Sequence, residues 1–522
     1  MTAAWSLSAA QRDETARRVA SNLFTMGFTK GLPISDDQAL EAAISFEEKA
    51  YTAASVAATT TTGNRPLSET TKAYSRKLSE QVIELIKAGG IVAAASQDPQ
   101  QCSGEELDLF GSRDFLTESS AKQALAPLLA RGSSIRKVRL STKSFGRDAA
   151  TVAASALANV SATLTDVDIS DIIAGRPEDE ALDALRIISA ALLPARLARV
   201  NLSDNALGEK GVRAAGDLLS KQPALEALSL QNVGCSIHAC RAVEELLQQT
   251  TSLSSLQLFN NMSDNQGALH IAAVLAHSPH MADFRMASSR VGPSGGIALA
   301  KALTTGRHLV KLDISDNPMT AAVGPALAAL VLVQPCLKIL NVNDTSLTDK
   351  GAMAVAVALG NSSCQLEELE MALNEITPTG AKAVAAAVAS KGGSLKRVNL
   401  RENELEDRGA VIIARGLAKA PGLLSIDLCG NQLKRVGAVA VAKAAANSCA
   451  SLTLLALDEN TVSETGLDEV RDIMEAAGKG EALGPLDENM EEDDEELEEE
   501  EDEEDGDDAS DLSALLAKTG LA

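Results

Sequence analysis

Apolar positions recur along most of the chain in one fixed order, L-x-x-L-x-L-x-x-N-x-L. The segment from Leu197 to Leu207 shows the pattern, with Asn205 at its asparagine position. The same position returns along the chain at residues 143, 172, 205, 233, 261, 289, 317, 345, 374, 403, 431 and 460. Successive positions are 28 or 29 residues apart, except for one gap of 33. This regularity indicates a solenoid of stacked units, each packed on its neighbours.

Each repeat predicts a short strand followed by a helix. The x-L-x-L part alternates with a period of two, so its aliphatic residues point inward from a parallel strand. The Asn side chain can bond backbone groups where the chain turns away from that strand. A glycine six residues later precedes Ala-rich segments that favour a helix, at Gly211, Gly267, Gly295, Gly351, Gly380, Gly409, Gly437 and Gly466. We therefore predict an α/β fold over residues 133–484, a leucine-rich-repeat horseshoe like that of ribonuclease inhibitor.

Irregular repeats stand out against this background. The gap of 33 falls in the segment IIAGRPEDEALDALRI, and an insertion after a strand projects from one rim, where solenoids present binding loops. The first two copies have Lys143 and Ile172 in place of Asn, as expected of a cap region. A later copy has Val233, with Asn232 one position before it. We interpret Asn232 as lying off the repeat frame and facing outward.

The two ends of the chain do not follow the repeat. Segments 11–27, 35–57 and 68–90 each suit an amphipathic helix, so we predict a small all-α domain over 1–90. Residues 91–132 would then be a linker and N-terminal cap. Residues 485–522 form an acidic tail, since 18 of the 22 residues from Asp487 to Asp508 are Asp or Glu. We expect self-repulsion to keep this tail disordered.

Composition excludes several classes of function. The net charge is −25, and without the 18 tail carboxylates it falls to −7, so no broad basic face exists for nucleic acid. Aromatic residues make up 2% of the chain, too few for base-stacking platforms. No apolar stretch is long enough to span a bilayer, and the N-terminus lacks a secretory pattern. Seven cysteines without a CxxC pair indicate buried thiols in a reducing compartment, including Cys336, Cys364, Cys429 and Cys449.

Motifs for catalysis or metal binding have simpler structural interpretations. Gly292–Gly296 matches G-x-S-x-G, but Gly295 is the repeat glycine and no triad partners accompany it. His270, His277 and His280 lack the carboxylates or cysteines of a metal site. No phosphate-binding G-x-x-x-x-G-K-[ST] is present. We expect no metal, no cofactor and no active site for a substrate of the chain's own.

A binding surface remains as the source of function. Polar residues expected on the strand-end rim are Arg176, Glu178, Asp179, Asp204, Asn205, Asn232, Asn260 and Asn261. For Asn205 and Asn261 the alternative is a structural repeat asparagine. For Arg176 the alternatives are a partner contact and a pair with a nearby carboxylate. For Asn232 the alternatives are a functional role and no functional role.

Several segments resemble a known family. Residues 202–214 (LSDNALGEKGVRA), residues 166–185 (DVDISDIIAGRPEDEALDAL), the 28–29-residue repeats and the acidic run resemble the Ran GTPase-activating proteins. The helical N-terminus resembles the plant-type version, whose first domain opens with Trp-Pro-Pro and targets the nuclear envelope. Here Trp5, the candidate targeting residue, is followed by Ser6-Leu7 instead.

The resemblance implies a function and a site. It aligns Arg176 with the family's characteristic arginine and Asn232 with the asparagine beside the GTPase active site, where members continue with Asn or Asp instead of Val233. The family orders the GTPase's own glutamine against the attacking water, so Asn232 would carry that role. The partner contacts would be Arg176, Glu178, Asp179, Asp204, Asn205 and Asn260.

The same resemblance implies partners and a location. The chain would be a GTPase activator for Ran in its GTP form that supports nucleocytoplasmic transport, with GTP and Mg²⁺ held by Ran. It would lie in the cytoplasm and at the cytoplasmic face of the nuclear envelope, with envelope anchor proteins bound through residues 1–90. The alternative is a non-catalytic leucine-rich-repeat scaffold or inhibitor, although such inhibitors are richer in Cys. A histone-binding acidic leucine-rich protein is a third possibility, but it would have shorter repeats.

Overall fold

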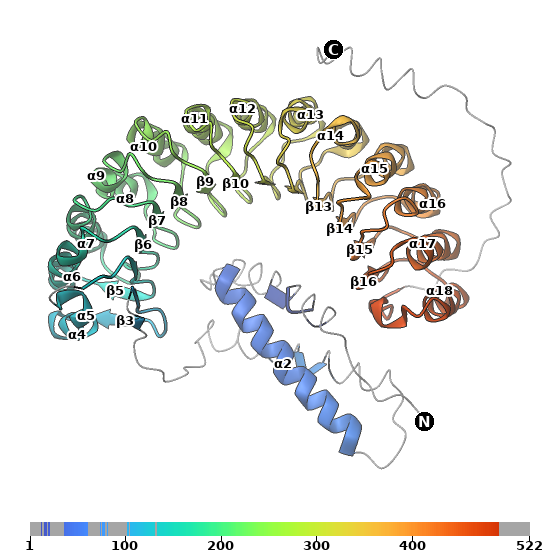
Figure 1. Ribbon diagram of the computed structural model, residues 1–522, viewed down its shortest axis with the longest axis horizontal. Coiled ribbons are helices and arrows are strands. Elements are labelled where there is room, and N and C mark those ends of the chain that lie inside the picture. Colours follow the sequence, from blue (N-terminus) through green and yellow to red (C-terminus); the bar gives the residue numbers. More distant parts are fainter. Residues whose placement is uncertain are drawn as a thin grey trace. The chain divides into compact units, whose positions relative to one another are not determined.

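The computed structural model describes residues 12, 15–17, 19–20, 36–60, 74, 76–78, 81, 102–103, 105–130 and 133–489 (Figure 1). The chain divides into two compact units. The first comprises residues up to 101 together with 109–114, and the second comprises 102–108 and the residues from 115 onward. Trp5 and the acidic run beyond Asn489 lie outside the described residues.

The N-terminal unit is built around helix α2 (Asp36–Thr60), where the sequence predicts a helix over 35–57. Its apolar face packs in a small cluster with residues from the two flanking segments, including Ala16, Tyr74 and Leu78. Glu47 on α2 is buried, and it accepts hydrogen bonds from Arg12 Nη2 at 2.7 Å and Tyr74 Oη at 3.0 Å. Because a buried carboxylate is costly unless it is paired, these bonds tie the three segments together. The described residues between 12 and 81 are all helical, as the sequence predicts for this segment.

The second unit contains a sheet of 14 strands in sequence order, apart from β3 and β5, which form a separate pair. After the antiparallel start β1–β2, every neighbouring pair is parallel. In most strands the middle residue is buried and the two outer residues are partly exposed, as the predicted alternation requires. The strands are β1 (Cys102–Ser103), β2 (Glu106–Asp108), β3 (Asp114–Leu116), β4 (Lys137–Arg139), β5 (Lys143–Phe145), β6 (Asp166–Asp168), β7 (Arg199–Asn201), β8 (Ala227–Ser229), β9 (Ser255–Gln257), β10 (Asp283–Arg285), β11 (Lys311–Asp313), β12 (Ile339–Asn341), β13 (Glu368–Glu370), β14 (Arg397–Asn399), β15 (Ser425–Asp427) and β16 (Leu454–Ala456).

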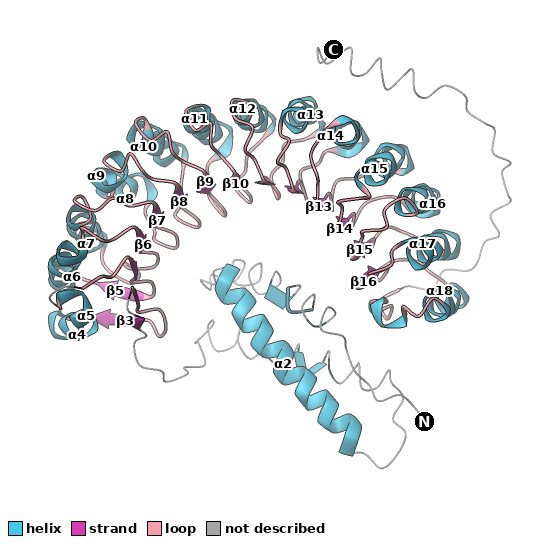
Figure 2. Ribbon diagram, in the orientation of Figure 1, coloured by secondary structure: helices cyan, strands magenta, loops and turns pink. Residues whose placement is uncertain are grey.

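Helices form the outer layer of this unit and strands its inner layer, as Figure 2 shows. Small residues let neighbouring helices approach closely. A Cβ on Gly324 would lie 2.8 Å from the Cα of Gly351 in the next repeat. The helices are α4 (Glu118–Ala124), α5 (Ala126–Leu129), α6 (Arg147–Val160), α7 (Glu178–Ala191), α8 (Gly208–Ala214), α9 (Gly216–Ser220), α10 (Ile237–Leu247), α11 (Asp264–Ala276), α12 (Pro293–Leu303), α13 (Gly324–Val333), α14 (Thr348–Asn361), α15 (Pro378–Lys391), α16 (Glu406–Leu417), α17 (Arg435–Ser448) and α18 (Glu464–Ala476), with short 3₁₀ turns at Ala321–Val323 and Gly480–Ala482. The leucine-rich-repeat fold predicted from the periodicity is confirmed.

The repeat asparagines form a buried ladder between the two layers. Asn317 is 2% exposed, and its Nδ2 donates to the carbonyls of Met286 and Ile314 at 2.8 and 3.0 Å. Its Oδ1 accepts from the backbone N–H groups of Ser289 and Val291 at 3.1 and 2.9 Å. Each such side chain satisfies backbone groups of its own repeat and of the preceding one, which would otherwise be buried without partners.

Both ends of the solenoid extend beyond the expected boundaries of 133 and 484. Strand β2 pairs in parallel with β4, so the sheet already begins within the segment expected to be a linker and cap. At the other end, Leu486 is buried and Asn489 Oδ1 accepts from the backbone N–H of Asn460 at 3.2 Å. Asn489 therefore occupies the asparagine position of one further, incomplete repeat. The first residues of the segment expected to be a disordered tail are packed on the fold.

The cysteine prediction needs one correction. Cys364, Cys429 and Cys449 are buried thiols, but Cys336 is exposed. Cys336 directly follows Pro335 after the end of α13, so it lies in the surface turn before the next strand instead of in the apolar layer. Within the described ranges, no helix is both long enough and apolar enough to cross a bilayer.

Candidate functional site

Each repeat leaves its strand through a residue with left-handed backbone. Asp204, Asn232 and Asn260 have φ of 59°, 50° and 54°. Asn and Asp tolerate this conformation better than other residues that carry a Cβ. Their backbone N–H groups donate to the carbonyls of Gln231, Phe259 and Ala287, at 2.9, 2.8 and 3.1 Å. The three side chains therefore start from equivalent points of successive repeats.

The same three side chains are joined by hydrogen bonds. Asn232 Nδ2 donates to Asp204 Oδ1 at 3.1 Å, and Asn260 Nδ2 donates to Asn232 Oδ1 at 3.1 Å. Asn232 is exposed, and the other two side chains are partly buried. We call Asp204, Asn232 and Asn260 the rim ladder. The exposure of Asn232 agrees with the sequence analysis, but its position does not, because it occupies a regular place in the repeat, one residue before the buried asparagine position.

A rigid layer supports the rim ladder. The hydroxyls of Ser203 and Ser229 lie 2.8 Å apart, and Ser203 Oγ accepts from the backbone N–H of Gln231 at 3.1 Å. Phe259 is 7% exposed, and the guanidinium of Arg285 lies 4.1 Å from the centre of its ring. These contacts restrain the backbone on both sides of Asn232, so its amide is presented from an ordered surface.

Two residues near the rim ladder belong to the interior. Asn205 is 1% exposed, its Nδ2 donates to the carbonyls of Ile169 and Leu202, and its Oδ1 accepts from Ile172 N–H at 3.0 Å. Asn205 is therefore one of the structural asparagines and is not part of the exposed rim, which corrects its expected role as a partner contact. Val233 is completely buried at the equivalent position of the next repeat. The absence of the repeat asparagine at Val233 thus affects the interior and leaves the exposed rim unchanged.

Arg176 is held by contacts within the insertion and its neighbours. Its Nε donates to Ser144 Oγ at 3.0 Å and its Nη2 to the Ser144 carbonyl at 2.9 Å. Nη1 lies 3.5 Å from Glu180, and the guanidinium lies 5.1 Å from the ring centre of Phe115. The side chain is 17% exposed. Of the two alternatives for Arg176, the local carboxylate pair is therefore present.

Glu178 and Asp179 lie in the first turn of helix α7 and are exposed. Carboxylates are favourable there because the helix N-terminus carries partial positive charge. Glu178 also pairs with Lys210 of α8. The insertion thus ends in an acidic surface on a helix, and it is anchored to the neighbouring repeat.

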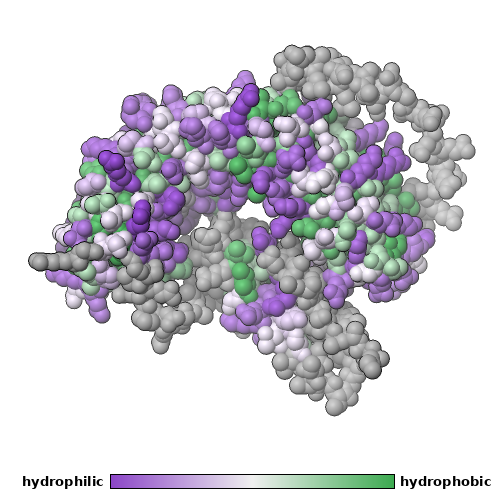
Figure 3. Space-filling view, viewed as in Figure 1, coloured by the Kyte–Doolittle hydropathy of each residue, from purple (hydrophilic) through white to green (hydrophobic). Residues whose placement is uncertain are grey.

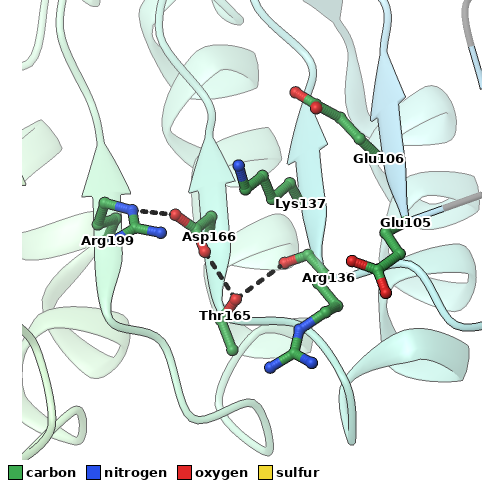
Figure 4. Close-up of a pocket in the computed structure, with 7 residues that line it drawn as sticks. All are labelled: Glu105, Glu106, Arg136, Lys137, Thr165, Asp166 and Arg199. Atoms are coloured by element: carbon green, nitrogen blue, oxygen red, sulfur yellow. Dashed lines mark hydrogen bonds and ion pairs between the residues drawn. The ribbon is translucent and has the colours of Figure 1, made fainter. Parts of the chain in front are cut away.

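A pocket missed by the sequence analysis lies near the N-terminal ends of the first strands (Figure 4). Thr165 Oγ1 donates to Asp166 Oδ2 at 2.6 Å, and Asp166 also pairs with Arg199. The side chains that line this pocket include charges of both signs. The lining residues are Glu105, Glu106, Arg136, Lys137, Thr165, Asp166 and Arg199. This mixture favours no single ligand charge. No group of three or more His, Cys, Asp or Glu suited to a metal occurs in the part of the chain that the structure describes.

Hydrophilic side chains are spread along the visible face of the solenoid, with smaller hydrophobic areas between them (Figure 3). In the rim ladder, polar groups able to donate and accept hydrogen bonds lie side by side on three successive repeats. This surface suits recognition of a polar group on another molecule better than docking of an apolar segment.

Two family models match parts of this chain. Residues 2–96 match the WPP domain family, and residues 333–356 and 362–385 match a leucine-rich-repeat family. Two solved structures of low similarity are a TLR13–ssRNA13 complex (13% identity, TM-score 0.37, 66% of this chain and 41% of that one) and an internalin from Listeria monocytogenes (14%, 0.38, 74% and 91%).

Two curated relatives come from Arabidopsis thaliana. RAN GTPase-activating protein 1 is 42% identical over 166 residues, which is 30% of this chain and 29% of the relative. RAN GTPase-activating protein 2 is 41% identical over 161 residues, 30% of either chain. The matched part therefore spans less than a third of these relatives. Together with the WPP domain and the repeats, these matches confirm that the chain resembles the plant-type Ran GTPase-activating proteins.

Proposed function

We propose that this protein is a GTPase-activating protein for Ran and that Asn232 orients the catalytic glutamine of Ran. The similarity to two relatives named as Ran GTPase-activating proteins supports the partner. The exposed, hydrogen-bonded amide of Asn232 is the observation that carries the mechanism. Ran would hold GTP and Mg²⁺, so this chain would need neither a cofactor nor an active site of its own.

A fixed amide suits this task physically. Phosphoryl transfer to water depends mainly on positioning and charge stabilisation, with little covalent help from protein groups. A primary amide has both donors and an acceptor, so it can bond the carboxamide of a glutamine and restrict its rotation. Orienting reacting groups in this way lowers the activation barrier because their entropy is lost before the reaction. The supported rim ladder supplies such an amide without a mobile loop.

The central experiment is single-turnover GTP hydrolysis on Ran with Asn232→Ala. We expect the stimulated rate to fall about 100-fold or more, the usual effect of removing one oriented polar group from a reaction centre. Glu402→Ala is a matched control, because Glu402 has the same left-handed backbone (φ 51°) in a later repeat. The control should retain full activity, and the far-UV circular dichroism of both variants should match the parent. Normal turnover by Asn232→Ala would end this proposal. Binding without acceleration by the parent protein would instead favour a non-catalytic scaffold.

We propose different roles for the other residues of this complex, according to their exposure and contacts. Asp204 and Asn260 adjoin Asn232, and Glu178 and Asp179 are exposed on α7. Arg176 would act mainly by holding the insertion in place, since its guanidinium is bonded to Ser144. We expect Arg176→Ala to weaken activation and to lower thermal stability together, which a stimulated-hydrolysis assay and a melting curve would measure. Full activity at unchanged stability would remove Arg176 from the proposal.

The acidic run would increase the rate of association with a basic surface on Ran. Exposed charges attract over about 10 Å at 0.1 M salt, so the effect should fade as salt rises. Because Leu486 and Asn489 are part of the last repeat, the deletion should begin after them and remove 490–508. We expect slower association at low salt and equal association at high salt in stopped-flow experiments. Equal rates at low salt would contradict this role.

Location in the cytoplasm and at the cytoplasmic face of the nuclear envelope, and support of nucleocytoplasmic transport, belong to the same proposal. The match of residues 2–96 to the WPP domain family supports a role for this unit in targeting, with Trp5 as the candidate residue and envelope anchor proteins as partners. A fluorescent fusion should label the nuclear rim, and Trp5→Ala should abolish that signal. Rim labelling that survives loss of residues 1–90 would contradict this assignment.

A further inference from the structure

We infer that Asp204 and Asn260 set the direction in which the Asn232 amide faces, so they act as positioning residues for it. This inference rests on the function proposed above. In this inference, Asp204 and Asn260 are not separate partner contacts. They are the two outer members of the rim ladder, and they hold the amide of Asn232 between them.

The direction of the amide follows from the chemistry of its neighbours. An ionised carboxylate has no proton to donate, so the group of Asn232 that lies 3.1 Å from Asp204 Oδ1 must be its NH₂. The carbonyl oxygen of Asn232 then faces Asn260, whose NH₂ lies 3.1 Å away and can donate to it. An isolated surface asparagine can exchange its amide oxygen and nitrogen with little change in shape. A carboxylate on one side and an amide donor on the other remove that freedom.

The rim ladder leaves part of Asn232 available. Its two hydrogen bonds within the ladder use one N–H and one oxygen lone pair, so one N–H and one lone pair of this exposed amide are not used by the ladder. A primary carboxamide on a partner presents the complementary acceptor and donor side by side. The direction of the Asn232 amide therefore decides whether this pair of bonds can form in register, and turning it over would place donor against donor.

The decisive test exchanges the two neighbours. In the double variant Asp204→Asn, Asn260→Asp, the net charge is unchanged and both hydrogen bonds can form again. Their direction is reversed, because Asn232 must now donate toward position 260 and accept from position 204. Positions 204 and 260 both have left-handed backbone, which Asn and Asp tolerate. We expect wild-type thermal stability, a similar concentration for half-maximal activation, and a fall of about 10- to 100-fold in the saturated hydrolysis rate on Ran. A structural role alone would be rescued by this exchange, so a full rate would overturn the inference.

Single substitutions separate positioning from direct contact. Asp204→Asn alone removes the preference for one direction and should slow the saturated rate less than the exchange does. In an Asn232→Ala background, the same change should cause no further slowing, because effects that act through one residue are not additive. Persistent slowing there, or a raised concentration for half-maximal activation, would show that Asp204 contacts the partner itself and would overturn the inference.

The proposed function and this inference fail in different ways. If Asn232→Ala alone has a normal rate, the function assigned to Asn232 fails and the inference fails with it. If Asn232→Ala is slow but the exchange variant is fast, only the inference fails. Glu402→Ala remains the control for nonspecific effects at this backbone position.

Discussion

The rims of the two halves of the solenoid have the same backbone conformation but carry side chains of different chemistry. In the N-terminal half, the left-handed positions carry Asp204, Asn232 and Asn260, which bond to one another. In the C-terminal half, the equivalent positions include Leu373, which is 43% exposed, and Glu402 and Glu459, both of which pair with Arg401. The repeat places one side chain per unit at the rim, and the identity of that side chain decides whether the rim presents amides or internally paired charges.

Beneath the rim, the buried asparagines have the same structural role in both halves. Removing one such asparagine from each half tests this similarity. Asn205→Ala and Asn403→Ala should each lower the free energy of unfolding by about 3 kcal/mol, since several buried backbone groups lose their partner at about 1–3 kcal/mol each. Asn403 is 3% exposed, and its Oδ1 accepts from Asn374 and Ile376 N–H groups at 3.0 and 3.1 Å. Urea unfolding measures the loss, with Asn232→Ala as the exposed control. A loss at Asn205 as small as at Asn232 would contradict its structural role.

The inner face of the C-terminal half contains a carboxyl group, that of Glu370, whose pKa is raised. Burial raises the pKa of Glu370 from its ordinary 4.5 to about 7, with smaller increases from Glu368 and Asp427, although Asn399 and Asn343 donate to its carboxylate at 2.7 and 3.2 Å. The folded state thus binds this proton more tightly than the unfolded state. Its stabilising contribution is complete below about pH 4.5 and is lost as the pH rises through about 7.

Glu370→Gln should remove this loss and raise the free energy of unfolding at pH 8 by about 1–2 kcal/mol, less than the full shift implies because the side chain is partly exposed. At pH 4.5 the variant should match the parent. The neutral Gln257 occupies the matching place on β9, so Gln257→Ala serves as a control without this pH dependence. Urea titrations at both pH values measure the difference. A variant as sensitive to pH as the parent would assign the effect to other groups.

The smallest effect is expected from the paired charges of the C-terminal rim. Glu459→Ala breaks an ion pair with Arg401 whose two side chains are 33% and 22% exposed. Such pairs contribute about 0–1 kcal/mol, so the melting temperature should change little. Stimulated hydrolysis on Ran should be unchanged, in contrast to Asn232→Ala. A clear loss of activity would mean that the proposed contact surface extends into the C-terminal half.

The repeat could be predicted from sequence because its signal is local and recurs many times. The Leu, Asn and Gly positions predict the strands, the hydrogen-bonded turns that follow them and the helices. The last copy was missed because Asn489 stands within an acidic run and Gly484 occupies an aliphatic position. Composition indicated disorder there, although Leu486 packs against the sheet and is buried.

The site was predicted only in part. The residues beside Val233 and the family resemblance both indicate Asn232, which does lie exposed on the rim, but at a regular place in the repeat and not off its frame. For Asn205 the sequence leaves a surface contact and a structural repeat asparagine open, and burial of the side chain decides for the structural role. The contacts of Arg176 with Ser144 and Phe115 join segments 32 and about 60 residues away, which no local pattern reveals.

By itself, the sequence determined the solenoid, its period, its aliphatic core and the helical unit before it, because these follow from side-chain spacing and the need to bury apolar surface. The tertiary structure decided which polar residues face solvent, where the repeats end and how the Asn232 amide is directed. Those properties depend on neighbours one repeat away, which stacking brings within hydrogen-bonding distance, and on the chemistry of whichever side chains meet there.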